Sequence, residues 1–312
     1  MSPLDPPRGL VDSSPEGLAV ARVLRIERGH AEVWLDGDAR LLPVSKKQLR
    51  ACQPVTGDWA HVDVARGVVT GLAPRATCLR RRAPAARGGD QAVVANFDVA
   101  LIVMGLDGDF SIRRAERYAA LVATSGADAV VLLTKAASVT LAKEAVAAVA
   151  DAVGDAPVHA IDVVAGVGLE VARRALGRRV GVVIGSSGAG KSTLTNHLLG
   201  EAHQPTREVR ARDSRGRHTT VRRELFLLPG GGAIIDTPGL REVGLADDAD
   251  LDDAFADLAG LAAGCRFGDC RHESEPGCAV RVAVDEGALA ESRVEAWRRL
   301  REERATSQRR GR

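Results

Sequence analysis

The sequence predicts a multidomain protein: a central α/β domain with a phosphate-binding loop, preceded by a small β-barrel and followed by a mostly helical, zinc-binding subdomain. Three observations predict this organisation. A glycine-rich phosphate loop follows an apolar strand in the middle of the chain, short strand-like runs fill the first third, and cysteines gather with a histidine near the end. A chain of 312 residues is long enough to bury two hydrophobic cores.

The first third of the chain contains a predicted tail and a predicted barrel. Residues 1–16 are rich in proline and lack the apolar core of a secretory signal, so we expect a disordered tail. Residues 17–76 should form the barrel, because short apolar runs there are separated by turn residues, although periodicity does not distinguish one kind of small barrel from another. Arg80, Arg81 and Arg82 then form a basic linker that could lie along a phosphate backbone. The five predicted strands are residues 18–26, 30–35, 40–44, 58–64 and 68–72.

Two continuous apolar runs, residues 98–104 and 129–133, predict buried strands on either side of a helix-like segment at 112–124. The second run leads into Thr134-Lys135-Ala136-Ala137, where a base-recognition motif of the form Asn-Lys-x-Asp would stand in a GTPase. A further short strand is expected at 157–161. These base-side elements therefore come before the phosphate loop.

Residues 180–193, VGVVIGSSGAGKST, join an apolar strand to the pattern G-x-x-x-x-G-K-[ST]. Backbone N–H groups of such a loop face the phosphates, while Lys191 would neutralise their charge and Ser192 would coordinate magnesium. The helix that begins near Lys191 adds the positive end of its dipole. We therefore expect a nucleoside triphosphate with Mg²⁺, although the loop alone does not separate GTPases from ATPases. The predicted phosphate-binding residues are Gly185, Ser186, Ser187, Gly188, Ala189, Gly190, Lys191, Ser192 and Thr193.

The motif Asp236-Thr237-Pro238-Gly239 follows another apolar strand at 232–235 and favours a GTPase. In this D-x-x-G motif Asp236 would hold the magnesium ion through water, and the Gly239 amide would donate to the γ-phosphate. An ordinary GTPase places its base motif after this point, but here the chain continues into acidic and cysteine-rich sequence. The GTPase elements are thus present in circularly permuted order.

Three of the five cysteines gather with one histidine near the end of the chain, at Cys265, Cys270, His272 and Cys278. Three thiolates and an imidazole complete a closed tetrahedral shell, which suits a structural zinc site. Disulfide pairing is the alternative, but the other cysteines are scattered and a reducing compartment is favoured. We predict one structural Zn²⁺ that stabilises residues 245–312, a subdomain too poor in apolar residues to fold alone.

Together these motifs resemble the circularly permuted, ribosome-small-subunit-dependent GTPases of the RsgA (YjeQ) family over nearly the whole chain. The strand entry at residues 95–98 and the segment Gly216-Arg217-His218-Thr219-Thr220 add to the resemblance. It implies an OB-type barrel, a permuted GTPase domain at residues 77–244, and GTP hydrolysis that releases the protein from the small subunit late in its maturation. The barrel and the zinc subdomain would bind ribosomal RNA. No apolar run is long enough to span a membrane, and we expect a cytoplasmic monomer.

The predicted switch loop, residues 207–220, is rich in arginine and has no apolar period. Thr219 or Thr220 is the candidate second magnesium ligand. Leu240 stands where many GTPases carry a glutamine that orients water, so hydrolysis must recruit another group. The resemblance points to His218 as that catalytic group; a solvent-exposed loop histidine is the alternative interpretation.

The base motif departs from the family pattern. In Asn-Lys-x-Asp the carboxylate accepts hydrogen bonds from guanine N1 and N2, whereas Ala137 has no acceptor. Thr134 replaces the asparagine, and Asp162-Val163 replaces the Ser-Ala that the family tends to place beside the base. Losing a charged acceptor costs about 1.5 to 3 kcal/mol, so we expect weaker GTP binding and weaker discrimination against ITP, unless another residue supplies the acceptor. The alternative functions are a nucleotide-dependent rRNA-binding scaffold with little turnover, and an NTPase of relaxed base specificity.

Overall fold

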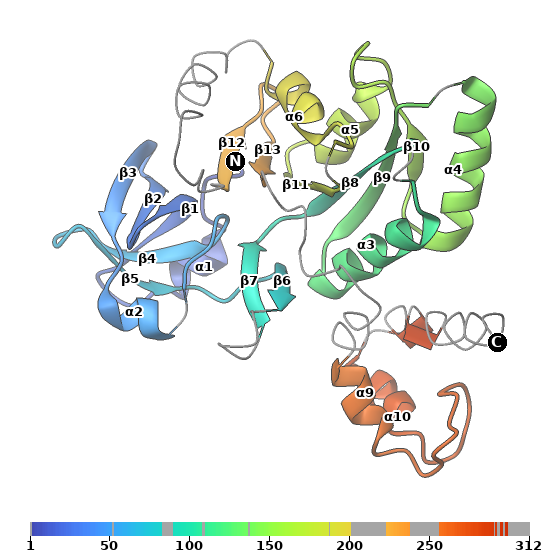
Figure 1. Cartoon of the computed structure of the whole chain (residues 1–312). Helices are drawn as coiled ribbons and strands as arrows, with labels where there is room; N and C mark the ends of the chain where they lie inside the picture. Colours follow the sequence, from blue (N-terminus) through green and yellow to red (C-terminus); the bar gives the residue numbers. More distant parts are fainter. Residues whose placement is uncertain are drawn as a thin grey trace. The chain divides into compact units, whose positions relative to one another are not determined.

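The computed structural model describes residues 2–51, 53–82, 90–107, 110–136, 138–186, 188–200, 223–237 and 256–289, with residues 291, 294, 295, 297 and 298 (Figure 1). The chain divides into two compact units, Met1–Val243 and Gly244–Arg312. None of the helices within these described ranges combines the length and apolar character needed to cross a membrane.

The first unit begins with a short helix, α1 (Arg8–Asp12), in the stretch where the sequence predicted a disordered tail. Leu4, just before it, is buried, which explains why this segment packs rather than extending into solvent. The apolar runs of the next segment become five strands. These are β1 (Ala19–Glu27), β2 (His30–Leu35), β3 (Asp38–Pro43), β4 (Trp59–Asp63) and β5 (Val68–Leu72), with helix α2 (Lys46–Ala51) between β3 and β4.

Strand β1 pairs antiparallel with both β2 and β4, while β3 pairs with β2 and β5 pairs with β4. A parallel bridge between Val44 and Val69 joins the end of β3 to β5, so the pairing returns on itself. Alternate residues of these strands point inward to one apolar core. The core residues are Ala21, Val23, Ala31, Val33, Leu35, Val44, Ala60, Val62 and Val69.

The arginine-rich segment at residues 80–82, predicted as a linker, lies in a β-strand instead. Strand β6 (Cys78–Arg82) pairs antiparallel with β7 (Asp90–Ala95) in a separate two-stranded sheet. The physical reason is a pair of apolar anchors: Leu79 lies opposite Val94, and both side chains are buried. This buried pair, with Cys78 opposite the buried Ala95, holds a short strand whose last three residues are arginines.

The α/β domain contains a sheet with the spatial order β10-β9-β8-β11-β13-β12. The first five of these strands are parallel, and β12 is antiparallel at the end of the series. If β11, β12 and β13 are numbered 1 to 3 and β8, β9 and β10 are numbered 4 to 6, the spatial order of the strands is 6-5-4-1-3-2. The strand that leads into the phosphate loop, β11, therefore lies in the centre of the sheet. The strands are β8 (Val99–Gly105), β9 (Asp128–Thr134), β10 (Val158–Ala160), β11 (Val180–Gly185), β12 (Glu224–Leu227) and β13 (Ala233–Asp236).

Helices cover both faces of this sheet (Figure 1). Helices α5 (Leu169–Leu176) and α6 (Lys191–Leu199) pack on the face to which alternate residues of β8 and β9 point. Helices α3 (Ile112–Ser125) and α4 (Val139–Val153) pack against each other and against β8, β9 and β10, on the face to which the remaining residues point. With both faces covered, β8 and β11 are buried along their whole length, which is why they appear in the sequence as continuous apolar runs.

The N-terminal strands join the α/β sheet through β1, which pairs with β12 at Arg25 and Glu224. Beside this junction the guanidinium of Arg22 is buried, donates to the Asn96 carbonyl oxygen at 2.7 Å, and lies over the ring of Trp59. Burial lowers the pKa of Arg22 to about 10, although nearby carboxylates oppose the shift. The junction is therefore a packed, charged contact and not a flexible connection.

The second unit contains α9 (Ala256–Ala262) and α10 (Ala279–Asp285), joined by an irregular segment. This segment carries the cysteines and the histidine that the sequence analysis singled out.

Candidate nucleotide site and metal centre

The predicted phosphate loop lies at the carboxyl edge of the parallel sheet. Strands β8, β11 and β13 are neighbours and run in the same direction, so the residues that follow each of them meet at this edge. The buried Thr237 donates its hydroxyl to the Val183 carbonyl oxygen at 2.7 Å, which fixes the end of β13 against β11. Asp236, the last residue of β13, is therefore brought to the edge from which the loop begins.

Two glycines of the loop occupy positions where no side chain fits. Gly185 has φ 141°, and a Cβ there would lie 2.0 Å from the Val103 carbonyl oxygen. Gly190 has φ 97°, and a Cβ there would lie 2.9 Å from Val163 Cγ2. The loop backbone thus turns tightly between the two neighbouring segments, as the glycine spacing predicted.

Lys191 begins helix α6 and folds back over the loop. Its ammonium group donates to the Gly185 carbonyl oxygen at 2.8 Å and also to the Ser186 carbonyl oxygen. A phosphate oxygen is a stronger partner for an ammonium group than a neutral carbonyl oxygen, so the same group is placed to turn to a ligand held by the loop. Ser192 lies in the first turn of α6 and is exposed.

Thr134 lies at the end of β9 and is completely buried. Its hydroxyl lies 2.7 Å from the Ala189 carbonyl oxygen and 3.3 Å from that of Met104, and it donates to these two acceptors. Thr134, predicted as the first residue of the base motif, therefore connects the phosphate loop to the ends of β8 and β9.

Replacing Thr134 with valine should weaken both folding and nucleotide binding. Valine has the same shape but no donor, so the buried Ala189 carbonyl loses its partner, at a cost of about 1 to 3 kcal/mol. Denaturant unfolding and nucleotide titration would measure the two effects. Serine at position 134 should preserve both properties, and Thr140→Val on the exposed start of α4 is the matched control. Unchanged affinity and stability in Thr134→Val would show that this hydrogen bond does not support the loop.

Lys135 follows Thr134 with φ 58° and extends beside the phosphate loop. Its Nζ donates to Asp107 Oδ2 at 2.7 Å, and it lies 3.9 Å from where a Cβ on Gly188 would stand. Both charged side chains are 43% exposed, so the ion pair orients Lys135 more than it stabilises the fold. Sequence reasoning missed Asp107, because nothing in its local pattern distinguishes it from a turn residue.

Several predicted site residues lie outside the described part of the chain. They are Ala137, Ser187, His218, Thr219, Thr220 and Gly239. Their assigned roles stay predictions. The described predicted residues that lie at the same edge of the sheet are Thr134, Lys135, Lys191, Ser192 and Asp236.

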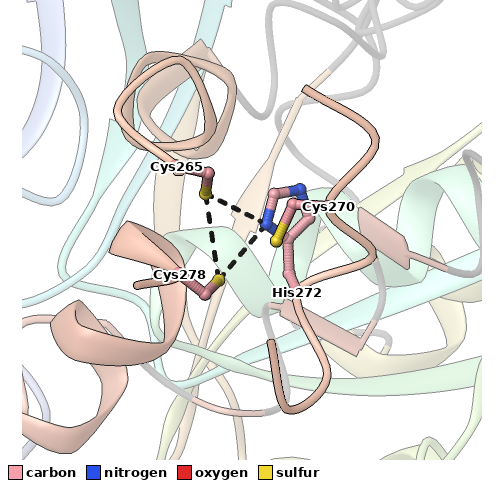
Figure 2. A group of neighbouring side chains, drawn as sticks. All are labelled: Cys265, Cys270, His272 and Cys278. Carbon is pink, nitrogen blue, oxygen red and sulfur yellow. Dashed lines mark hydrogen bonds between the residues drawn. The ribbon is translucent and has the colours of Figure 1, made fainter. Parts of the chain in front are cut away.

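The predicted metal ligands Cys265, Cys270, His272 and Cys278 converge in the second unit, with their ligand atoms all within 4.8 Å of one another (Figure 2). The His272 Nδ1 atom lies 3.5 Å from Cys265 Sγ and 3.4 Å from Cys278 Sγ, and these two sulfurs are 3.9 Å apart. A tetrahedral zinc ion with ordinary bond lengths would separate two sulfurs by about 3.8 Å and a sulfur from a nitrogen by about 3.5 Å. The three measured separations therefore match a tetrahedral metal ion, and Cys270 Sγ, within 4.8 Å of the other ligand atoms, is close enough to complete the set.

Neighbouring groups fix the ligands in place. Cys278 caps α10, where its sulfur accepts from the Arg281 amide at 3.4 Å, and the positive end of the helix favours a thiolate. The carboxylate of Glu275 accepts hydrogen bonds from the Arg271, Glu273 and Ser274 amides, which lowers its pKa to about 2. The Trp297 ring lies 5.0 Å from that of His272, centroid to centroid, and is buried. Sequence spacing could not indicate these contacts.

Comparisons with known proteins agree with this geometry. The RsgA GTPase family model matches residues 72–246. The chain is 42% identical over 301 residues to the small ribosomal subunit biogenesis GTPase RsgA of Xylella fastidiosa, covering 90% of this chain and 88% of the relative. It is 43% identical over 301 residues to the protein of the same name from Streptomyces coelicolor, with coverages of 92% and 81%.

Two solved structures share the fold. The YjeQ structure from Thermotoga maritima aligns with a TM-score of 0.57 at 22% identity, covering 91% of this chain and 98% of that one. The structure of YloQ, described as a circularly permuted GTPase, aligns with a TM-score of 0.52 at 21% identity, with coverages of 90% and 93%. The permuted strand order predicted from the sequence is thereby confirmed.

Proposed function

This chain belongs to the RsgA GTPase family, and we propose that it hydrolyses GTP on the small ribosomal subunit during late maturation, with hydrolysis driving its release. The observation that carries the proposal is the phosphate loop itself, which Thr134 holds at the sheet edge and which follows β11, the neighbour of the strand that ends in Asp236. The two relatives described above, which are 42% and 43% identical to this chain over 301 aligned residues, are named small ribosomal subunit biogenesis GTPases.

The described residues fit a triphosphate with magnesium. Gly185 and Gly190 let the loop turn tightly against Val103 and Val163. Lys191 supplies a positive charge, and Ser192 and Asp236 would supply oxygen ligands of the kind that magnesium prefers. When bound, magnesium would neutralise charge that develops on the phosphates. Thr219 or Thr220 would add a ligand, and Ala136, Ser187, Thr193 and Gly239 would complete the contacts to the nucleotide.

We assign a structural zinc ion to the Cys/His cluster. A set of three sulfurs and one nitrogen leaves no open position, which excludes a water-activating role and suits a structural one. In this proposal the ion organises residues 245–312 for contact with ribosomal RNA.

The N-terminal region is proposed to be an OB-type barrel, residues 17–76, that also contacts ribosomal RNA. The pairing of β1 with both β2 and β4, together with the parallel bridge from Val44 to Val69, supports a five-stranded closed barrel of this kind. The GTPase domain would then span residues 77–244, and we propose a monomer that acts in the cytoplasm.

Hydrolysis measured with and without purified small subunits tests the function. Strong stimulation of GTP turnover would support it, whereas subunit binding without stimulation would favour the scaffold. Similar turnover of GTP, ITP and ATP would favour the alternative NTPase of relaxed base specificity, a candidate that rests on the missing acceptor at Ala137.

Replacing His218 with alanine should lower subunit-stimulated turnover and spare nucleotide affinity. A positioned general base contributes about 10²- to 10⁴-fold to a rate, while the phosphate loop would still hold the ligand. Single-turnover hydrolysis and equilibrium titration separate the two quantities, with His159→Ala as the matched control. If turnover on small subunits stayed at the control level, His218 would have no part in the mechanism.

A further inference from the structure

Guanine offers two hydrogen-bond donors on one edge, N1–H and the 2-amino group, and a carboxylate is the side chain best suited to accept from both. Adenine presents an acceptor at N1, so the same carboxylate excludes it. Ala137, two residues after Lys135, cannot accept. If the proposed function holds, another residue must supply the acceptor or the site cannot select guanine.

Asp162 leaves the sheet beside the predicted base motif. Strands β9 and β10 are parallel neighbours with Ala160 opposite Leu133, and the Ile161 amide donates to the Leu133 carbonyl oxygen at 2.8 Å. The chain after β10 therefore emerges next to the chain after β9, which begins with Lys135. Asp162 thus lies at the same sheet edge as the base motif and one strand further out.

The neighbour of Asp162 anchors it to the phosphate loop. Val163 is buried, and its Cγ2 atom is the atom nearest to where a Cβ on Gly190, the residue that precedes Lys191, would stand. A purine attached to phosphates in this loop must extend toward β9 and β10, because β13 and its Asp236 occupy the other side. Asp162 lies in that direction.

The carboxylate of Asp162 is held in one orientation with one oxygen left over. Its Oδ1 accepts from the Val164 and Ala165 amides, each at 2.9 Å, and the Asp162 and Val167 backbones exchange two hydrogen bonds. Among the described residues, none donates to Oδ2, and the side chain is exposed. Oδ2 is therefore an oriented acceptor that the fold itself does not use.

The other described acceptors nearby are already engaged. At the end of β8, Asp107 pairs with Lys135 at 2.7 Å. After β9, the Ser138 hydroxyl accepts from the Leu141 amide and caps α4. Among the described carboxylates at this end of β8, β9 and β10, Asp162 is the one that keeps an oxygen for a ligand.

We propose that Asp162 supplies the carboxylate that reads the guanine edge, in place of an acidic residue at position 137. The acceptor has moved from the end of β9 to the end of the neighbouring strand β10. This inference rests on the proposed function and names its specificity-determining residue.

The Asp162→Asn variant gives a sharp test, because asparagine keeps an oxygen for the Val164 and Ala165 amides and turns the ligand-facing acceptor into a donor. A donor there repels the guanine edge and matches xanthine, which has a carbonyl oxygen at position 2. Titration with fluorescent GDP and XDP should show about 10- to 100-fold weaker GDP binding and a gain for XDP. Asp155→Asn, before β10 at the other end of the strand, is the matched control and should bind GDP like the parent protein.

A second variant covers the outcome in which Asp162→Asn binds neither nucleotide. The exchange Asp162→Ser with Ala137→Asp returns the carboxylate to the position it has in Asn-Lys-x-Asp, and it should restore GDP binding that Asp162→Ser alone loses. Failure of the exchange to restore binding would contradict the proposal.

The proposal would also be overturned if Asp162→Asn kept the parent preference for GDP over XDP, or if the parent protein bound GDP, IDP and ADP equally. In both cases nucleotide binding persists, so the proposed function survives. A parent protein that binds no nucleotide at all would instead remove the proposed function, and this inference with it.

Discussion

Stripping the metal from the Cys265, Cys270, His272 and Cys278 cluster should unfold the second unit. Helices α9 and α10 have only seven residues each, so they offer little apolar packing once the ligands separate. Structural zinc sites of this kind contribute about 10 to 16 kcal/mol of apparent binding free energy, which is comparable to the whole stability of a small domain. The ion is thus expected to determine whether this unit folds.

Zinc release and limited proteolysis would measure this effect together. Titration with a chelator should release one equivalent of zinc and, in step, open residues after 244 to protease while the first unit stays resistant. The Cys278→Ala variant should behave like the stripped protein. Its control is Cys78→Ala, which changes a cysteine on β6 that belongs to no cluster of potential metal ligands in the described chain. Protease resistance that survives complete metal removal would contradict a structural role.

Replacing Lys191 with alanine should have the largest effect on the nucleotide site. The ammonium group is the positive charge that helix α6 presents beside the loop, and its partners within the protein are carbonyl oxygens that a phosphate can replace. A charged hydrogen bond contributes about 1.5 to 3 kcal/mol, so nucleotide affinity should fall about 10- to 150-fold. The melting temperature should change little, because the loop conformation is held by Thr134 and by the two glycines.

Isothermal titration calorimetry of the protein with a non-hydrolysable GTP analogue, in the presence of Mg²⁺, would measure this loss of affinity. Lys143→Ala, on the exposed surface of α4, removes the same charge away from the loop and should bind like the parent protein. Equal affinities of the Lys191 and Lys143 variants would mean that the phosphates do not contact the loop lysine.

The elements that follow from local pattern could be predicted from the sequence. Residues 18–26 and 129–133, for example, became β1 (Ala19–Glu27) and β9 (Asp128–Thr134), because burial on one or both faces leaves a direct periodic signal. The glycine spacing likewise predicted the shape of the phosphate loop. Its tight contacts with Val103 and Val163 are what make glycine necessary there.

Contacts between distant segments could not be predicted in this way. Thr134 was read as part of the base motif, yet its hydroxyl is bonded to Ala189, a residue 55 positions further along the chain. Arg80 was assigned to a linker, because the basic residues around it give no apolar pattern, whereas β6 is held by the pairing of Leu79 with the distant Val94. The fixed carboxylate of Asp162 depends on a turn that sequence pattern does not reveal. Each of these features depends on a partner that local periodicity does not encode.

A crystal structure with a non-hydrolysable GTP analogue and Mn²⁺ in place of Mg²⁺ tests the nucleotide site most directly, since manganese can be located by its anomalous scattering. We predict one manganese peak beside Ser192 and Asp236, with Lys191 turned from the Gly185 carbonyl to the phosphates. A nucleotide bound elsewhere, or a metal peak away from these side chains, would contradict the assignment of this loop as the site of GTP hydrolysis.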